Sequence, residues 1–271
     1  MTTACSAPAP APAAASRATP TATVTAVPGW PSAMAAIGHS GLTGYDSKDR
    51  GVDAKSNSWA TGDNPDVDSV YARIVAQNPA MTGHAVNLAV DGSGVVDLLR
   101  QAKALASMDP KPELILVQSI DNDMQCDGTD AEHLPVYREG LVEVMDALAA
   151  GVPDATVMFV SQWGSVERYD AAIVQVAPSH VAGSGPCDTV DPATQQIVPE
   201  KEAGLQALVD EYFATIVDVC SQYEHCMTDG GAMQGMEVEP ADLTPDFNHL
   251  SEAGHAKMAA IVWQVLYGDQ Q

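Results

Sequence analysis

The 271-residue sequence predicts an α/β fold in which helices cover both faces of a mostly parallel β-sheet. From residue 33 onward, short apolar runs alternate with longer amphipathic runs. The short runs are almost continuously apolar, which is typical of strands buried on both faces of a parallel sheet. No internal repeat or second linker interrupts this alternation. We therefore expect one domain over 28–271.

Each element is expected where its pattern is clearest. Strand candidates, bounded by Gly, Pro or Asp, cover 33–39, 84–90, 113–119 and 155–162. Helical patterns cover about 65–78, 95–107, 134–150, 201–222 and 251–267. Ligands bind at the carboxyl ends of the strands in such sheets, so the residues that follow each strand are the first candidates for a site.

The charge balance is strongly acidic, with 12 Lys and Arg against 36 Asp and Glu and a formal net charge of -24. Such a surface repels nucleic-acid phosphates and anionic membranes. No run approaches the roughly 20 apolar residues that a membrane span needs. We expect no nucleic-acid partner and no integral membrane span.

The first 27 residues differ from the rest because Ala, Pro, Thr and Ser dominate them. Without large apolar groups to bury, this segment is expected to be a disordered tether. The stretch around Cys5 is similar to the end of a bacterial lipoprotein signal whose hydrophobic part has been removed. That interpretation predicts a lipid anchor at Cys5 and a place outside the cell; the alternative is an ordinary tail with an incidental cysteine.

Four further cysteines form an even set, which favours two disulfides in an exported protein. Cys220 and Cys226 are close in sequence, so we favour the pairs Cys126–Cys187 and Cys220–Cys226, although three connectivities are open. A zinc site is the rival interpretation, but the sequence contains no CxxC pair and the spacing fits none.

Polar residues at the strand ends form a possible acyl-transfer site. Ser40 follows the first strand between Gly38 and Gly41 and could be a nucleophile, with His249 as its base and Asp246 orienting that base. The backbone N–H of Gly92 and the side-chain amide of Asn122 could stabilise an oxyanion.

Each of these signals alone has a simpler explanation, such as a turn serine or an aspartate that caps a helix. His39 is a rival base, but adjacent residues leaving a strand usually point to opposite sides. The spacing of Asp121, Asp123 and Asp127 does not fit an EF-hand calcium loop. The other histidines show no ligand spacing, and we expect no metal or cofactor.

Together, in this order, the stretches resemble the sequence blocks of the SGNH hydrolase (GDSL esterase/lipase) superfamily. Block I corresponds to Gly38-His39-Ser40, and block II to the run Asn87-Leu88-Ala89-Val90-Asp91-Gly92. Block III corresponds to Ile120-Asp121-Asn122-Asp123, and block V to Asp246-Phe247-Asn248-His249. The resemblance covers most of 33–267 and implies a flavodoxin-like three-layer α/β/α sandwich.

Two positions depart from the family pattern. His39 stands where the family has Asp, a position that supports the turn. Ile120 replaces the Gly of block III, which is expected to alter the backbone around Asn122. The resemblance implies a serine esterase with Ser40, His249 and Asp246 as catalytic residues. The oxyanion would be bound by the N–H groups of Ser40 and Gly92 and by Asn122.

We expect short acyl esters, acetyl above all, on a carbohydrate or small molecule, and a secreted or surface-tethered monomer. Trp59 and Trp163 either line a pocket or pack under loops. Two alternatives remain open: a cell-surface binding module on the same fold, and an acyltransferase that uses the same acyl-enzyme.

Overall fold

The computed structural model describes residues 25–268. Nearly all of the tether expected at 1–27, including Cys5, lies outside the described residues.

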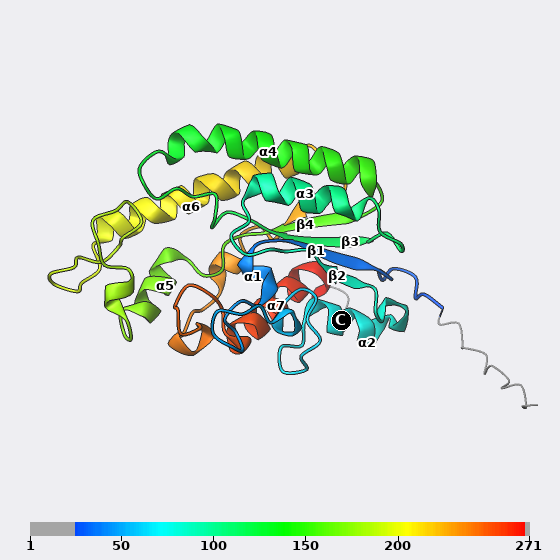
Figure 1. Cartoon of the computed structure of the whole chain (residues 1–271), viewed down its shortest axis with the longest axis horizontal. Helices are drawn as coiled ribbons and strands as arrows, with labels where there is room; N and C mark the ends of the chain where they lie inside the picture. The colour runs from blue at the N-terminus through cyan, green and yellow to red at the C-terminus, as the bar shows by residue number, and fades with distance from the viewer. Residues whose placement is uncertain (1–24, 269–271) are drawn as a thin grey trace, which may run out of the picture.

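A sheet of five parallel strands forms the centre of the molecule (Figure 1). The expected parallel sheet is thus confirmed, although the second strand is shorter than predicted and the fifth was not predicted at all. The strand order is β2-β1-β3-β4-β5. The strands are β1 (Met34–Gly38), β2 (Ala85–Asn87), β3 (Leu114–Gln118), β4 (Thr156–Val160) and β5 (Cys226–Thr228).

Helices cover both faces of this sheet (Figure 1). On one face lie α3 (Val95–Leu105), α4 (Asp130–Gly151) and α6 (Pro199–Cys220), and on the other lie α2 (Val70–Gln77) and α7 (Glu252–Tyr267). Two shorter helices, α1 (Ser40–Thr43) and α5 (Val166–Ile173), follow β1 and β4. Short 3₁₀ turns occur at Lys55–Asn57, Pro79–Met81, Pro178–His180, Met233–Gly235 and Pro240–Asp242.

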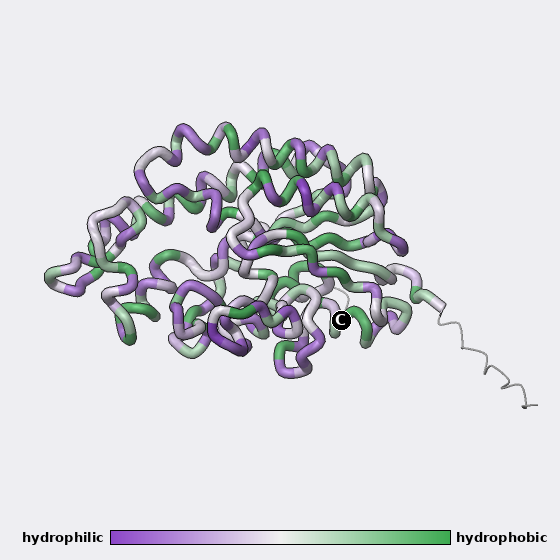
Figure 2. The backbone as a smooth tube through the Cα atoms, in the orientation of Figure 1, coloured by the Kyte–Doolittle hydropathy of each residue, from purple (hydrophilic) through white to green (hydrophobic). Residues whose placement is uncertain are grey.

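The continuous apolar character of the strands follows from their two buried faces. Met34, Ala36 and Leu116 pack toward the α2 and α7 layer, while Ile37 and Val117 pack toward α3, α4 and α6. Successive residues of a strand point to opposite faces, so both sets must be apolar. Figure 2 shows these strands as the most consistently hydrophobic part of the chain.

The four cysteines form the two disulfides that the sequence analysis favoured. Cys126–Cys187 joins the loop after β3 to the long segment between α5 and α6. Cys220–Cys226 joins the last residue of α6 to the first residue of β5.

The strand order places a topological switch point between β1 and β3. The chain leaves β1 toward β2 on one side and leaves β3 toward β4 on the other, and a ligand-binding crevice is expected beyond the carboxyl ends of two such strands. Gly38 of β1 lies opposite Gln118 of β3. The residues that follow both strands therefore meet at this crevice.

A buried glutamine on α3 fixes the end of β1. The Gln101 side chain accepts a hydrogen bond from Gly38 N (2.7 Å) and donates one to Gly38 O (2.9 Å). Its amide also donates to Ser93 Oγ (3.2 Å). Gln101 thereby links the strand that precedes Ser40 to the segment that follows Gly92.

Replacing this side chain by one of similar shape tests the link. Gln101→Leu removes the acceptor of a buried N–H, and such a group costs about 1–3 kcal/mol when left unsatisfied. We expect the free energy of unfolding, measured by urea titration, to fall by about that amount. In Gln222→Leu, which alters an exposed glutamine, the change should stay within about 0.5 kcal/mol. Equal midpoints for the two variants would contradict the role of Gln101.

Candidate active site

Ser40 lies in the turn that follows β1 and is the first residue of α1. The preceding residue, His39, caps this helix, since its Nδ1 accepts a hydrogen bond from Gly41 N (3.2 Å). The helix ends within one turn at Gly44, whose φ of 64° is left-handed. The turn leaves Ser40 partly exposed at the carboxyl edge of the sheet, while His39 is buried.

The two glycines around Ser40 are required by Gln118. A Cβ on Gly38, where φ is 149°, would lie 2.2 Å from the Gln118 carbonyl oxygen. A Cβ on Gly41 would lie 2.6 Å from the Gln118 side-chain nitrogen. Gln118 is itself fixed, because its Oε1 accepts from the Trp59 indole (3.2 Å). The turn can approach β3 this closely only without side chains at both positions.

His249 and Asp246 form a close pair on the loop before α7. His249 Nδ1 lies 2.7 Å from Asp246 Oδ2. The loop is closed by a bridge between Leu243 and Leu250, and by a hydrogen bond from Thr244 N to His249 O (2.9 Å). The pair therefore stands on a short, internally bonded turn.

The other carboxylate oxygen of Asp246 accepts hydrogen bonds from three donors. Asp246 Oδ1 accepts from Thr244 Oγ1 (2.5 Å), Asn248 N (2.9 Å) and His249 N (3.2 Å). Partial burial raises the pKa of Asp246, but the hydrogen bonds from Thr244, Asn248 and His249 outweigh burial and hold that pKa below its usual value. A carboxylate that stays ionised can orient an imidazole and stabilise its protonated form.

The His249 ring lies near the Ser40 turn. Its centroid is 4.8 Å from that of Tyr45, which follows α1 by two residues. A positive charge on His249 also affects the pKa of His39. Burial lowers the pKa of His39, Asp121 raises it by a smaller amount, and His249 lowers it further. The structure thus brings the first and last predicted motifs to the same rim of the sheet.

Hydrogen bonds join the segments that carry Gly92 and Asn122. Asn122 Nδ2 donates to Ser93 O (3.2 Å), and Thr43 Oγ1 donates to Asp91 Oδ1 (2.7 Å). An amide carries two N–H donors, so Asn122 keeps a second one for another acceptor. Gly92 adopts a left-handed φ of 71° on the exposed side of the same rim. These bonds join the segments that carry Ser40, Gly92 and Asn122 at the carboxyl edge of the sheet.

Ile120, which stands in place of the block III glycine, has a backbone conformation that is typical of glycine. Ile120 has a φ of 111°, a conformation that favours glycine, although its side chain is fully buried. The backbone thus keeps a glycine-like course and carries a strain that is rare for a β-branched residue. Burial of the isoleucine side chain in the core offsets this strain.

His39 of block I and Asp121 of block III face each other. His39 Nε2 lies 3.7 Å from Asp121 Oδ2. Burial raises the pKa of Asp121, against smaller opposing contributions from His39 and His249. The His39 ring is buried, its Nδ1 caps the turn and its Nε2 faces Asp121, so both ring nitrogens are directed at groups other than Ser40 Oγ.

The aspartates that raised the question of calcium have other partners. Asp123 Oδ1 accepts from Val95 N at the start of α3 (2.8 Å), and Asp127 Oδ1 accepts from Thr129 Oγ1 (2.6 Å). Burial raises the pKa of Asp123 to about 6. Over residues 25–268, no three His, Cys, Asp or Glu side chains form a group that could hold a metal ion.

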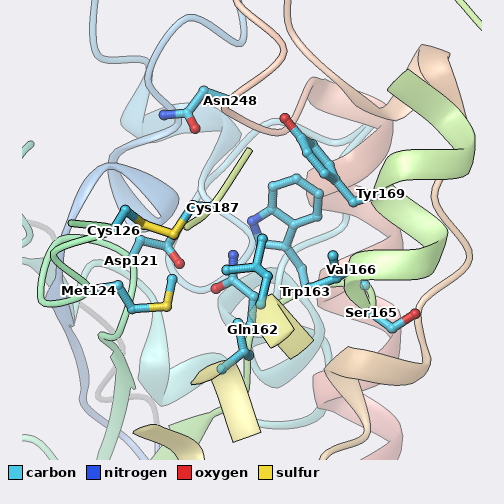
Figure 3. A pocket seen from close by; sticks show the side chains of 13 residues that line it. Asp121, Met124, Cys126, Gln162, Trp163, Ser165, Val166, Tyr169, Cys187 and Asn248 are labelled. Carbon is cyan, nitrogen blue, oxygen red and sulfur yellow. A yellow bond between two sulfur atoms is a disulfide. The ribbon is translucent and has the colours of Figure 1, made fainter. Parts of the chain in front are cut away.

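The two tryptophans have different environments. Trp59 is fully buried in the core. Trp163, which follows β4, lines a pocket of about 260 Å³ beside the crevice (Figure 3). Asp121 and Asn248 line the same pocket, so it adjoins both Asn122 and His249.

Sequence reasoning missed several residues of this site. Gln101, Gln118 and Gln162 belong to no motif, and a buried glutamine has no spacing signal in a single sequence. Their roles depend on contacts between distant segments, such as the 63 residues that separate Gly38 from Gln101.

The fold and the rim of motif residues define an α/β hydrolase of the SGNH type. The model of the family GDSL-like lipase/acylhydrolase matches residues 34–262, and the chain belongs to this family. No curated protein matches the sequence significantly.

Solved structures show the same fold at low identity. Phospholipase A1 from Streptomyces albidoflavus NA297 is 15% identical, with a TM-score of 0.54 over 87% of this chain and 98% of that one. An extracellular lipase from Streptomyces rimosus is 17% identical, with a TM-score of 0.52 over 87% and 98% of the two chains. A two-domain esterase active on acetylated mannans is 15% identical, with a TM-score of 0.51 over 87% of this chain and 49% of that one.

No helix within residues 25–268 is long and apolar enough to cross a bilayer.

The contact of Gly38 with Gln118 gives a sharp prediction. Gly38→Ala forces a Cβ against a carbonyl oxygen at a positive φ, and overpacking with backbone strain should cost about 2–5 kcal/mol of unfolding free energy. The same substitution at exposed Gly204 in α6, where a Cβ meets nothing within 4 Å, should stabilise the protein by about 0.5–1 kcal/mol. Chemical denaturation of both variants checks the opposite signs, and a stabilised Gly38→Ala protein would show that the contact is not tight.

The burial of His255, in the first turns of α7, predicts that the stability of the protein depends on pH. Burial lowers its pKa from 6.5 to about 3, and His249 adds to this shift. Between these values the unfolded chain binds more protons, so stability is full above pH 6.5 and is lost as the pH falls. At pH 5 the loss from this one group is about 2 kcal/mol.

In His255→Gln, the decrease in unfolding free energy between pH 7.5 and pH 5 should be smaller than in the wild type by about 2 kcal/mol. Denaturation curves at the two pH values measure this difference. Parallel pH profiles for the two proteins would contradict it.

Proposed function

We propose that this protein is a serine esterase that hydrolyses short acyl esters through an acyl-enzyme on Ser40. The observation that carries the proposal is the 2.7 Å pairing of His249 with an ionised Asp246 at the rim where the Ser40 turn stands. A hydroxyl nucleophile, an imidazole base and a carboxylate that orients it are the parts that acyl transfer requires.

In the proposed reaction, His249 takes the proton of Ser40 as its Oγ attacks the ester carbonyl. The resulting oxyanion is stabilised by the N–H groups of Ser40 and Gly92 and by the free amide N–H of Asn122. His249 then protonates the leaving alcohol, and water releases the acid from the acyl-enzyme in the same way. Asp246 holds the imidazole and stabilises its positive charge.

A short acyl group on a carbohydrate or a small alcohol is the proposed substrate. The similarity in fold to an esterase active on acetylated mannans supports a carbohydrate, although at 15% identity the likeness is one of fold. Two disulfides support action outside the cytoplasm. A monomeric state and a lipid anchor at Cys5 stay predictions from the sequence.

The nucleophile is tested with p-nitrophenyl acetate. Ser40→Ala should lower kcat by about 10³-fold or more, as removal of a triad member does in other enzymes, with an unchanged circular dichroism spectrum. Ser221→Ala, which alters an exposed serine after α6, is the matched control and should retain wild-type activity. If the wild type and both variants hydrolyse the ester only at the background rate, the result would favour the non-catalytic binding module instead. Product analysis with a competing alcohol would reveal an acyltransferase.

A further inference from the structure

The helix that begins at Ser40 has an unusual cap. His39 precedes this four-residue helix, and its Nδ1 accepts a hydrogen bond from Gly41 N (3.2 Å). Helices are usually capped by Ser, Thr, Asp or Asn, whose side-chain oxygens are always able to accept. The Nδ1 atom of a neutral histidine accepts only while the ring proton is on Nε2. The cap therefore works in one of the two tautomers of the ring and fails in the other.

The surroundings of the His39 ring decide which form is present. The residue is only 1% exposed, and burial lowers its pKa from 6.5. Asp121 opposes this shift by a smaller amount, and the charge of His249 adds to it. The ring is therefore mostly neutral at pH 7 and carries a single proton. Because Nδ1 accepts from Gly41 N, that proton must be on Nε2.

Asp121 is the group that this second nitrogen faces. Asp121 Oδ2 lies 3.7 Å from His39 Nε2. The distance is too long for a direct hydrogen bond, and Nε2 has no hydrogen-bond partner within the described part of the chain. Attraction between the N–H dipole and the carboxyl oxygen still favours a proton on this nitrogen, and it is stronger in a poorly solvated site than in water. A carboxyl group can accept in this way whether or not it is ionised.

We propose that Asp121 is a positioning residue: it holds the proton of His39 on Nε2 and thereby keeps the cap that orders the Ser40 turn. For its effect on the reaction, this inference rests on the proposed function. The helix after the cap has only four residues, so one cap supplies a large share of the bonds that fix it. Without the cap, Ser40 Oγ is less well placed against His249, and misplacement of a reacting group lowers its rate of attack. The loss is therefore expected in kcat more than in KM.

Double substitutions test whether Asp121 acts through His39. Asp121→Leu removes the acceptor and should lower kcat for p-nitrophenyl acetate about tenfold, the effect of about one lost hydrogen bond. Asp121→Asn keeps an acceptor oxygen and should restore most of this loss. His39→Asn caps the helix without a proton to place, so Asp121→Leu should change kcat less than about twofold in that background. Asp154→Leu, which alters an exposed aspartate at the amino edge of the sheet, is the matched control.

A spectroscopic measurement separates this inference from the proposed reaction. NMR correlation of ¹H with ¹⁵N in the imidazole rings distinguishes protonated from unprotonated nitrogens, and His39→Asn identifies the signals of His39. Nε2 should carry the proton in the wild type, in Asp121→Asn and in Asp154→Leu, whereas both tautomers should be populated in Asp121→Leu. This pattern supports the hold of Asp121 on His39 even if no ester is hydrolysed, in which case only the proposed function fails.

Three results would overturn the inference while leaving the proposed function intact. The first is a proton on Nδ1 of His39 in the wild type, which needs no folded Asp121→Leu protein. The second is a tautomer that Asp121→Leu leaves unchanged, or changes without any loss of kcat. The third is an equal fall in kcat when Asp121→Leu is made in the wild type and in His39→Asn, because Asp121 would then act without His39. Circular dichroism checks that each variant is folded.

Discussion

The approach of the Ser40 turn to β3 is the contact on which the rest of the site depends. Gly38 and Gly41 lie against the backbone and the side chain of Gln118, and Gln101 bonds both backbone groups of Gly38 from the other side. A proposed nucleophile between two such supports has little freedom to move. Because β1 and β3 pair in parallel register, the same contact places Ser40 next to the segment that carries Asn122. The position of Ser40 therefore follows from the packing of Gly38 and Gly41 against Gln118 and Gln101.

The carboxylates around the crevice differ because their surroundings differ. Asp246 receives several hydrogen bonds, which keep it ionised despite partial burial. Burial raises the pKa of Asp121 and also that of Asp123, where backbone hydrogen bonds only partly compensate. The same side chain thus serves as a fixed negative charge in one position and as a poorly solvated acceptor in the others. Local hydrogen bonding, more than the overall charge of the protein, decides which behaviour occurs.

Much of the fold was predictable because strands buried on both faces leave a clear apolar signature. Four strands and five helices were expected near their observed positions, and the parallel sheet is confirmed. The fifth strand was missed since Cys226–Thr228 has only three residues, all of them partly buried. Helix α5 was also missed, although it is as long as α2, which was predicted.

The site was predictable where residue order along the chain carried the signal. Ser40, Gly92, Asn122, Asp246 and His249 could be named from four short motifs, although their catalytic roles stay proposals. Gln101 and Gln118 could not be found, because each acts through a partner far away in sequence. The positive φ of Ile120 could not be foreseen either, since a single sequence does not show how burial offsets a strained φ.

The pairing of His39 with Asp121 has a consequence for how such sequences can vary. With Asp at position 39, as the family pattern has it, a carboxylate would replace the imidazole whose Nε2 now lies 3.7 Å from Asp121 Oδ2. Repulsion between two buried carboxylates is costly unless one of them takes up a proton. Histidine at position 39 avoids that repulsion, because Asp121 then faces an imidazole. The side chain that position 121 can hold therefore depends on position 39, which also caps the Ser40 turn.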